Sequence, residues 1–252
     1  MDFNQYLQRI GVDRNILTAN LESLNRLHYQ HLLHVPFENL SIQCQQPISL
    51  ELEDIYQKVV LNQRGGHCYE LNHLFGHLLE ELGFQVRRVS GKVITREGAV
   101  GPDHDHLCLI VSLDKQDFLA DVGFGELFLY PKKMATPDPQ PEAISSFEIR
   151  QLPEHYEIWM QDRPEKPFER KYLFTLTPQT ISVFEEQNRI KQVDPSSHFV
   201  RHSMCSIATV DGRYTLFDHL FSHTQNGHKT KRTVNAESER QQILQAYFNI
   251  RL

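Results

Sequence analysis

The sequence has 252 residues, of which 40% are hydrophobic and 23% charged, a composition typical of a folded globular protein and not of a disordered chain. Its formal net charge of −6 argues against binding to a phosphate backbone, so we expect no nucleic-acid partner. Apolar runs are too short to span a bilayer and the N-terminus lacks a secretory pattern, which favours a cytoplasmic protein with no membrane contact and with reduced cysteines.

The first third of the chain is predicted to be helical. Asp13 is placed to cap the second helix, and Gly83 is placed to end the fourth. Pro36 stops the second helix, because the residue before a proline disfavours helical geometry. Apolar residues recur at helical spacing in four segments, at residues 3–10, 16–27, 52–60 and 71–82.

The middle of the chain is predicted to form strands. Asp114-Lys115-Gln116 is expected to reverse the chain between the second strand and the third, and the proline-rich residues 131–141 are expected to be a loop. The predicted strands are rich in Val, Ile, Leu and Phe and are bounded by turn residues, at 85–94, 107–113, 118–122, 147–152, 155–160 and 172–176.

The last part of the chain is predicted to be mixed. Residues 180–190 are expected to be helical, and Asp211-Gly212 to turn a hairpin between strands 207–210 and 213–217. The short basic run 229–232 is interpreted as a solvated loop, and a last helix is expected from about residue 236. Helices followed by strands and a mixed tail indicate an α+β fold.

Cys68 stands where a nucleophile is activated. The segment Arg64-Gly-Gly-His-Cys68 passes directly into the fourth predicted helix, so Cys68 lies at or near a helix N-terminus. The helix dipole and the free N–H groups there favour the thiolate, which is the form that attacks carbonyl groups. The alternative for a lone cysteine is a small buried apolar residue, which we expect for Cys44, Cys108 and Cys205.

His106 and Asp121 are the predicted partners of this nucleophile. His106 opens an apolar strand, and Asp121 ends the next one. If the two strands pair as a hairpin, the start of one lies beside the end of the other. A carboxylate at the end of an apolar strand needs a partner, and an imidazole suits it, because the carboxylate fixes the ring tautomer and stabilises the imidazolium. The sequence therefore predicts a Cys-His-Asp triad.

A zinc site is the alternative use of these residues. His104, His106 and Cys108 alternate along the predicted strand, and His67 flanks Cys68. No pair of ligands in a loop completes a tetrahedron, so we expect no metal. His104, on the same predicted strand face, is the main competitor of His106 for the catalytic role.

Five segments together form a pattern that spans almost the whole chain. They are Val35-Pro-Phe-Glu-Asn-Leu40, Arg64-Gly-Gly-His-Cys-Tyr-Glu-Leu-Asn72, Asp121-Val-Gly-Phe-Gly125, Asp194-Pro-Ser-Ser-His-Phe199 and Asp211-Gly-Arg-Tyr-Thr-Leu216. In this order they resemble the arylamine N-acetyltransferase family, bacterial type. The Arg-Gly-Gly-x-Cys element is the most specific part of the resemblance.

The resemblance implies a fold of three lobes. A helical bundle at residues 1–84 would carry the nucleophile, a central antiparallel β-barrel at 85–190 the His and Asp, and an α/β lid would follow at 191–252. The arrangement of Cys, His and Asp would be like that of papain-like and transglutaminase-like folds. We expect a monomer or a weak homo-oligomer.

The resemblance also implies an activity, in the class of xenobiotic metabolism. Acetyl-CoA would be the donor, and an arylamine, arylhydroxylamine or hydrazine the acceptor, in a ping-pong reaction through acetyl-Cys68. The matching positions imply that Phe37, Phe124 and Phe199 line the acceptor pocket. Gly123 and Gly125 would let backbone N–H groups approach the thioester or the pyrophosphate.

Two departures from the family pattern leave other readings open. His67 replaces the usual aromatic residue before the cysteine, and residues 102–105 differ from the usual approach to the triad histidine. The rivals are an amide synthase that closes a macrolactam, a transglutaminase-like or protease-like hydrolase with the same triad, and a catalytically silent protein that binds CoA or aromatic compounds.

Overall fold

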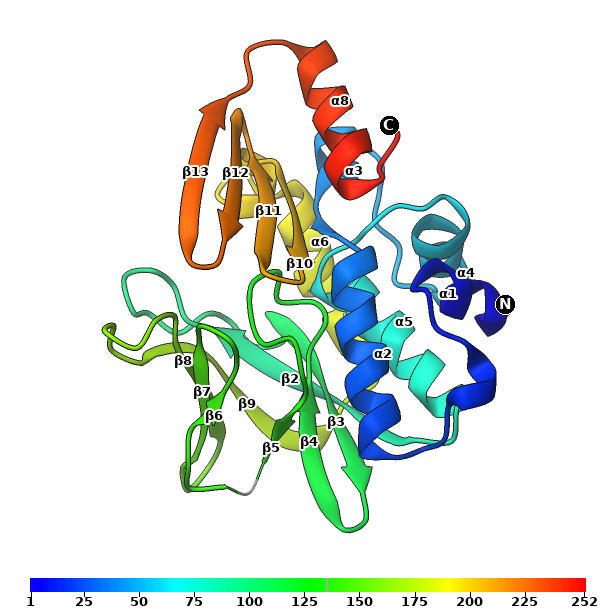
Figure 1. The fold of residues 1–252 in the computed structure, drawn as a ribbon, viewed down its shortest axis with the longest axis vertical. Helices are drawn as coiled ribbons and strands as arrows, with labels where there is room; N and C mark the ends of the chain where they lie inside the picture. Colours follow the sequence, from blue (N-terminus) through cyan, green and yellow to red (C-terminus); the bar gives the residue numbers. More distant parts are fainter. Residues whose placement is uncertain (135) are drawn as a thin grey trace.

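A layer of helices and two antiparallel sheets make up the computed structural model, which describes residues 1–134 and 136–252 (Figure 1). The fold is α+β, as predicted. The helical part runs through α1 (Phe3–Arg9), a 3₁₀ turn η1 (Arg14–Ile16), α2 (Leu21–His34), α3 (Leu40–Gln43), α4 (Leu52–Tyr56), a π-helical turn η2 (Gln57–Leu61) and α5 (Cys68–Glu81).

The second helix begins later than predicted. Asn20 caps α2, because its side chain accepts a hydrogen bond from the N–H of Ser23. Asp13 caps the separate turn η1 instead, through the N–H of Asn15. Gly83 follows α5 with a φ of +88°, in the left-handed conformation expected of it.

The larger sheet has eight antiparallel strands in the order β5-β4-β3-β2-β9-β8-β7-β6 and curves until β5 contacts β7. The predicted loop 131–141 contains two short strands, β5 and β6, while residue 135 lies outside the described residues. The strands are β2 (Gln85–Val93), β3 (His106–Leu113), β4 (Gln116–Ala120), β5 (Lys132–Lys133), β6 (Gln140–Pro141), β7 (Ser146–Gln151), β8 (Tyr156–Gln161) and β9 (Glu169–Pro178).

The smaller sheet has the strand order β1-β10-β11-β12-β13. Strand β1 (Phe37–Glu38) comes from the N-terminal part of the chain and pairs with β10 (Met204–Thr209). The hairpin of β10 and β11 (Gly212–Phe217) is confirmed. The rest of this region is a 3₁₀ turn η3 (Ile181–Phe184), α6 (Glu185–Val193), α7 (His198–Arg201), β12 (Leu220–Gln225), β13 (His228–Thr233) and α8 (Glu237–Phe248).

The interpretation of residues 229–232 as a loop was wrong. They belong to β13, which pairs along its length with β12 and is exposed at every position. Because its side chains are polar and solvated on both faces, no apolar alternation marks it as a strand. Residues 228–233 form a strand because their main chain is hydrogen-bonded to β12.

Strand β3 joins two hydrophobic cores. Its odd-numbered residues, Leu107, Leu109 and Val111, pack with α5 in the core under the helices. Its even-numbered residues, Cys108 and Ile110, lie in the core enclosed by the curved sheet. Side chains alternate between the faces of a strand, so a fully apolar strand is expected to serve two cores at once. A third core lies between the smaller sheet and α8.

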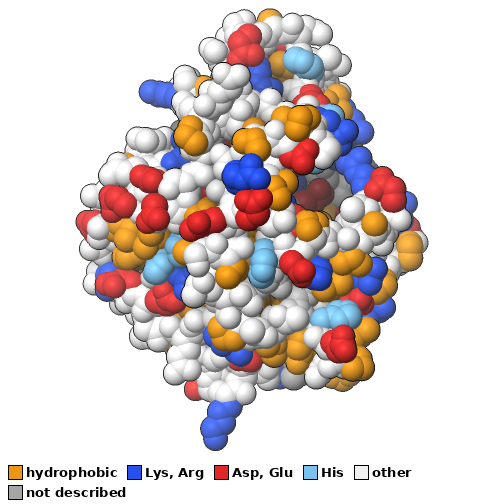
Figure 2. All heavy atoms as spheres, turned by 180° about the vertical axis from the view of Figure 1, so that it is seen from behind, with side chains coloured by type: hydrophobic (Ala, Val, Ile, Leu, Met, Phe, Trp, Pro, Cys, Tyr) orange, Lys and Arg blue, Asp and Glu red, His pale blue; other side chains and the backbone are white. Residues whose placement is uncertain are grey.

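The surface mixes both charges. On the face seen from behind, acidic and basic side chains are interspersed with apolar ones (Figure 2). Within the described residues, no helix combines the length and the apolar character needed to cross a membrane. The four cysteines are free, and all except Cys44 are buried.

Candidate active site

Cys68 is the first residue of α5, as the sequence predicted, and is 5% exposed. The loop before the helix is fixed to β1, because the Glu38 N–H donates to the Gly66 carbonyl at 2.9 Å and the Gly66 N–H donates to the Pro36 carbonyl at 3.3 Å. A Cβ on Gly65 would lie 2.0 Å from the Pro36 carbonyl oxygen, so only glycine fits there. The close contact of these two segments places the thiol at the helix N-terminus.

His106 and Asp121 meet as the hairpin hypothesis required. Strands β3 and β4 are joined by a two-residue turn at Asp114 and Lys115, both with positive φ, which fixes the register of the pair. His106 begins β3 and Asp121 directly follows β4, and His106 Nε2 lies 2.7 Å from Asp121 Oδ2. Both side chains are buried.

Three further donors hold the Asp121 carboxylate. Asn72 Nδ2 and the Gly123 N–H donate to Oδ1 at 2.8 and 3.0 Å, and the Tyr172 hydroxyl donates to Oδ2 at 2.9 Å. Burial alone would raise the pKa of Asp121, but the charge and hydrogen bond of His106, with the hydrogen bonds from Asn72 and Gly123, lower it. The carboxylate therefore stays ionised. Sequence reasoning missed Tyr172, which had no signal beyond that of a core aromatic residue.

The electrostatics favour a thiolate beside an imidazolium. Burial opposes the charged form of Cys68, yet the neighbouring rings of His106 and His67 lower its pKa to about 6. Burial likewise opposes the charged form of His106, but the Asp121 carboxylate, with the Cys68 thiolate, raises the pKa of the ring. Each charge stabilises the other, as a nucleophilic cysteine requires.

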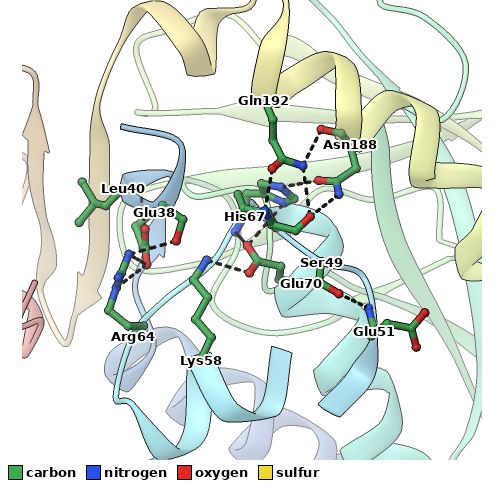
Figure 3. A network of polar contacts seen from close by, with 12 residues as sticks. Glu38, Leu40, Ser49, Glu51, Lys58, Arg64, His67, Glu70, Asn188 and Gln192 are labelled. Carbon is green, nitrogen blue, oxygen red and sulfur yellow. Dashed lines mark hydrogen bonds and ion pairs between the residues drawn. The ribbon is translucent and has the colours of Figure 1, made fainter. Parts of the chain in front are cut away.

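His67 is fully buried beside this pair. Its Nε2 lies 3.1 Å from Asn188 Oδ1 on α6, and its backbone N–H donates to Glu70 Oε2 at 3.1 Å (Figure 3). Glu70 in turn pairs with Lys58 at 2.8 Å. Sequence analysis identified His67 as unusual and assigned it no role. The polar network of Figure 3 shows that it bridges the helix carrying the nucleophile to α6.

Of the three phenylalanines predicted to line the acceptor pocket, Phe124 packs against His106, while Phe199 packs near His67 and Phe37. The Phe124 ring lies 5.4 Å from the His106 ring, between centroids, in an edge-on arrangement. The Phe199 ring lies 6.2 Å from His67 and 6.3 Å from Phe37. The structure thus brings together residues more than 160 positions apart in the chain. That they contact an acceptor stays a prediction.

Gly123 and Gly125 both pack tightly against this site. A Cβ on Gly123 would lie 2.7 Å from the Cys68 Cα, and a Cβ on Gly125, whose φ is +86°, would lie 3.1 Å from the Phe37 ring. The Gly123 N–H is already used by Asp121. These contacts explain why glycine stands at both positions. Contact with a CoA ester stays a prediction.

His104 does not compete with His106. It precedes β3 in a turn with a φ of +58°, so it does not share the strand face on which it was placed. Its Nδ1 lies 3.2 Å from Ser90 Oγ. Within residues 1–134 and 136–252, no three His, Cys, Asp or Glu side chains are grouped so that they could hold a metal ion.

The unusual loop 102–105 is held by a hydrogen bond and by two ion pairs. The Tyr69 hydroxyl donates to the His104 carbonyl at 2.7 Å, and Lys191 of α6 forms an ion pair with Asp105. Asp103 pairs with Lys92 at 2.6 Å. This loop therefore connects α5, β2 and α6 immediately before the histidine.

A buried ion pair supports the loop before the nucleophile. Arg64 Nε donates to Glu38 Oε1 at 3.0 Å, and Glu38 Oε2 accepts the Leu40 N–H at 2.6 Å (Figure 3). The Glu38 side chain is fully buried. Arg64 therefore holds this loop through the carboxylate of Glu38.

Replacing Arg64 with methionine should lower the free energy of unfolding by about 3–5 kcal/mol, because it leaves the Glu38 carboxylate buried and unpaired. Urea denaturation measures the loss. The control is Arg14→Met, since Arg14 makes a half-exposed pair with Glu81 at 3.8 Å and should cost at most about 1 kcal/mol. Equal losses in the two variants would contradict the prediction.

Comparison with known proteins places this site in a family. A sequence model described as N-acetyltransferase matches residues 20–252. The chain is 32% identical to the pineal gland isozyme NAT-3 arylamine N-acetyltransferase of Gallus gallus, over 100% of this chain and 95% of that protein.

Solved structures agree with the sequence match. The Mycobacterium marinum arylamine N-acetyltransferase in complex with CoA has a TM-score of 0.90 at 26% identity, covering 99% of this chain and 93% of that chain. The Bacillus cereus enzyme, described as having a unique Cys-His-Glu catalytic triad, has a TM-score of 0.91 at 27% identity. The match covers 100% of this chain and 100% of that chain. The matches extend across the helical layer and both sheets, and the chain belongs to the arylamine N-acetyltransferase family.

Proposed function

We propose that this protein transfers an acetyl group from acetyl-CoA to the nitrogen or oxygen of an arylamine, arylhydroxylamine or hydrazine, through an acetyl-Cys68 intermediate. Cys68, His106 and Asp121 are the catalytic residues of this proposal. The observation that carries it is the buried His106–Asp121 pair at 2.7 Å beside a cysteine whose pKa is lowered. We expect the reaction to take place in the cytoplasm.

The first half of the reaction loads the enzyme. The Cys68 thiolate attacks the thioester carbonyl, and the developing oxyanion is stabilised by free N–H groups at the start of α5. The carbon–sulfur bond to CoA then breaks, and His106 gives its proton to the departing thiolate. Asp121 holds the ring through Nε2, which leaves Nδ1 for this transfer.

The second half of the reaction transfers the acetyl group from Cys68 to the acceptor. The acceptor nitrogen attacks acetyl-Cys68, neutral His106 takes its proton, and the Cys68 thiolate leaves. Phe124 packs edge-on against His106, and Phe199 packs near Phe37 and His67; we expect these aromatic rings to bind a flat aromatic acceptor. The same apolar lining limits water, which would otherwise hydrolyse the intermediate.

A cleft beside Phe124 is the proposed site of the donor. Its volume is about 640 Å³, and it lies between the larger sheet and the smaller one, with Phe124 and Gly125 in its wall. The M. marinum relative was solved with CoA, and CoA carries phosphates that favour a cationic site. The cleft offers Arg96, Lys166, Lys171, Lys229 and Lys231, alongside the acidic Glu126, Asp162 and Glu169.

Acetyl-CoA without an acceptor should add one acetyl group to the protein, and peptide mass spectrometry should place it on Cys68. Adding an arylamine should then remove the adduct and give the acetylated amine. Cys68→Ala should form no adduct, whereas Cys44→Ala, which changes the exposed cysteine, should form it as the wild type does.

Absence of the adduct would contradict the proposal. Loading only from a carrier-bound acyl chain would identify an amide synthase, and turnover of peptide or glutamine substrates without CoA would identify a hydrolase. The acceptor that discharges the adduct fastest in a panel identifies the substrate class.

A further inference from the structure

A buried histidine of α2 is hydrogen-bonded to the main chain of the proposed triad acid. The Asp121 N–H donates to His28 Nε2 at 3.1 Å, and His28 Nδ1 lies 2.9 Å from the Leu129 carbonyl oxygen. The His28 side chain is fully buried and is 93 and 101 positions away from these two partners. One ring therefore joins both ends of the segment from Asp121 to Leu129, which carries Phe124.

The two hydrogen bonds fix which His28 nitrogen carries the proton. A main-chain N–H only donates, so Nε2 carries the lone pair, and a carbonyl oxygen only accepts, so Nδ1 carries the proton. Burial lowers the pKa of His28 to about 4, although the hydrogen bond to Leu129 and the charge of Asp121 oppose this. The ring is therefore neutral near pH 7, which is the form that can accept the Asp121 N–H.

Aromatic neighbours hold the His28 ring in this orientation. Phe128 stacks on it with 5.6 Å between ring centroids and an interplanar angle of 23°. Phe75 of α5 packs against it edge-on, at 6.0 Å between centroids. Phe128 belongs to the core of the larger sheet and Phe75 to the core under the helices, so the ring is packed between two cores. Both of its hydrogen bonds thus keep their direction.

The end of strand β4 explains why Asp121 needs a partner from outside the sheet. Pairing between β3 and β4 stops at Ala120, and side chains accept the N–H groups that follow. The Asp121 N–H goes to His28, and the Val122 N–H goes to Asn72 Oδ1 at 2.9 Å. Asn72 also holds the Asp121 carboxylate. Helix α5 therefore holds the side chain of the acid, and α2 holds its main chain.

We propose that His28 is a positioning residue of the triad. By holding the main chain of Asp121 from α2, it sets how closely the Asp121 carboxylate approaches His106. The proposal rests on the proposed function in that Asp121 is the triad acid. His28 transfers no proton and contacts no substrate in this scheme, so its whole effect passes through Asp121. Without it, a buried main-chain N–H is left unpaired and the end of β4 must shift.

Two amide substitutions separate the two hydrogen bonds. In His28→Gln the amide oxygen reaches as far as Nε2 and can accept the Asp121 N–H, whereas the shorter amide of His28→Asn replaces only the bond to Leu129. His28→Asn should slow the acetylation of Cys68 by acetyl-CoA roughly 100-fold, the effect of displacing a catalytic group by about 1 Å, and His28→Gln should stay within about threefold of the wild type. Rapid quenching and intact-mass spectrometry measure the rate. Equal rates in the two variants would overturn the proposal.

His28→Leu and His31→Leu form a matched pair. His31 is also fully buried on α2 and packs edge-on against Phe75, at 5.4 Å, but its Nδ1 is hydrogen-bonded to the Tyr6 hydroxyl at 2.6 Å. Both variants should lose stability, and only His28→Leu should acetylate slowly. Circular dichroism and melting curves set a temperature at which both are folded. If His31→Leu slows acetylation as much as His28→Leu does, the loss comes from the fold and the proposal is wrong.

A double variant shows whether the effect passes through Asp121. Adding His28→Asn to Asp121→Asn should cost less than about threefold further, because the acid that His28 positions has already lost its charge. A loss equal to the product of the two single losses would overturn the proposal.

The pH midpoint of Cys68 alkylation by iodoacetamide, followed by peptide mass spectrometry, gives a test without acetyl-CoA. A displaced Asp121 stabilises the His106 imidazolium less, so the midpoint should rise in His28→Asn and stay at the wild-type value in His28→Gln. An unchanged midpoint in His28→Asn would overturn the proposal. A wild type that forms no acetyl adduct would overturn the proposed function, whereas wild-type acetylation rates in all three His28 variants would overturn this proposal alone.

Discussion

Asp121→Asn is expected to lower kcat/KM by roughly 10³- to 10⁴-fold, the loss that a triad acid causes when its charge is removed and its shape retained. The asparagine has one acceptor oxygen where the carboxylate has two, so it cannot serve both His106 Nε2 and the donors on the other oxygen, and the charge that raises the pKa of His106 is gone. The imidazolium is then less stable, and with it the thiolate of Cys68. The thiolate exists above its pKa, so its midpoint should move upward and the acid side of the activity profile should move with it.

Steady-state rates and the alkylation midpoint of Cys68 are measured on the same variant. Asp138→Asn, in an exposed loop, is the control and should change neither. Asp121→Glu should recover part of the activity, since the B. cereus relative is described with a glutamate in its triad. A loss smaller than tenfold in Asp121→Asn, with an unchanged midpoint, would show that Asp121 only supports the fold.

Sequence periodicity identified the elements that bury one clear face. Helix α5 was predicted because its apolar residues recur at helical spacing and Gly83 ends it. Strand β13 was missed because it buries neither face. Strand β1 has two residues, which is too short for any periodicity, and it exists only because β10 lies beside it. The local sequence pattern of a segment does not indicate such pairings with distant strands.

The positions of the proposed catalytic residues could be predicted from local sequence, whereas the residues that support them could not. Cys68 is the first residue of a helix, and the two glycines just before it mark that helix start in the sequence. A two-residue turn between β3 and β4 brings Asp121 next to His106. Tyr172 and Asn188 reach the site from 51 and 121 positions away. Their contacts depend on how the sheets and α6 are packed, which single-chain patterns do not specify. The prediction placed His104 on the same strand as His106. Its positive φ keeps it out of the strand, which begins only at His106.

Gly123 controls how closely the loop that carries Asp121 approaches Cys68. A Cβ there would lie 2.6 Å from Asn72 Nδ2, 2.7 Å from the Cys68 Cα and 2.9 Å from the Cys68 carbonyl oxygen. Two of these atoms are backbone at the start of α5, so no side-chain rotation relieves the clash. The loop must move away from the helix, and Asp121, two residues earlier, must move with it.

Gly123→Ala is therefore expected to reduce kcat/KM by roughly 100-fold, the effect of displacing a catalytic group by about 1 Å, and to cost about 1–3 kcal/mol of stability through overpacking. Rates and urea denaturation measure the two effects. Gly98→Ala is the control, because no atom lies within 4 Å of its Cβ and its φ of +85° imposes only backbone strain. It should lose stability, by roughly 1–2 kcal/mol, and keep its activity. If Gly123→Ala retains full activity, the close contact between this loop and Cys68 is not what aligns the triad.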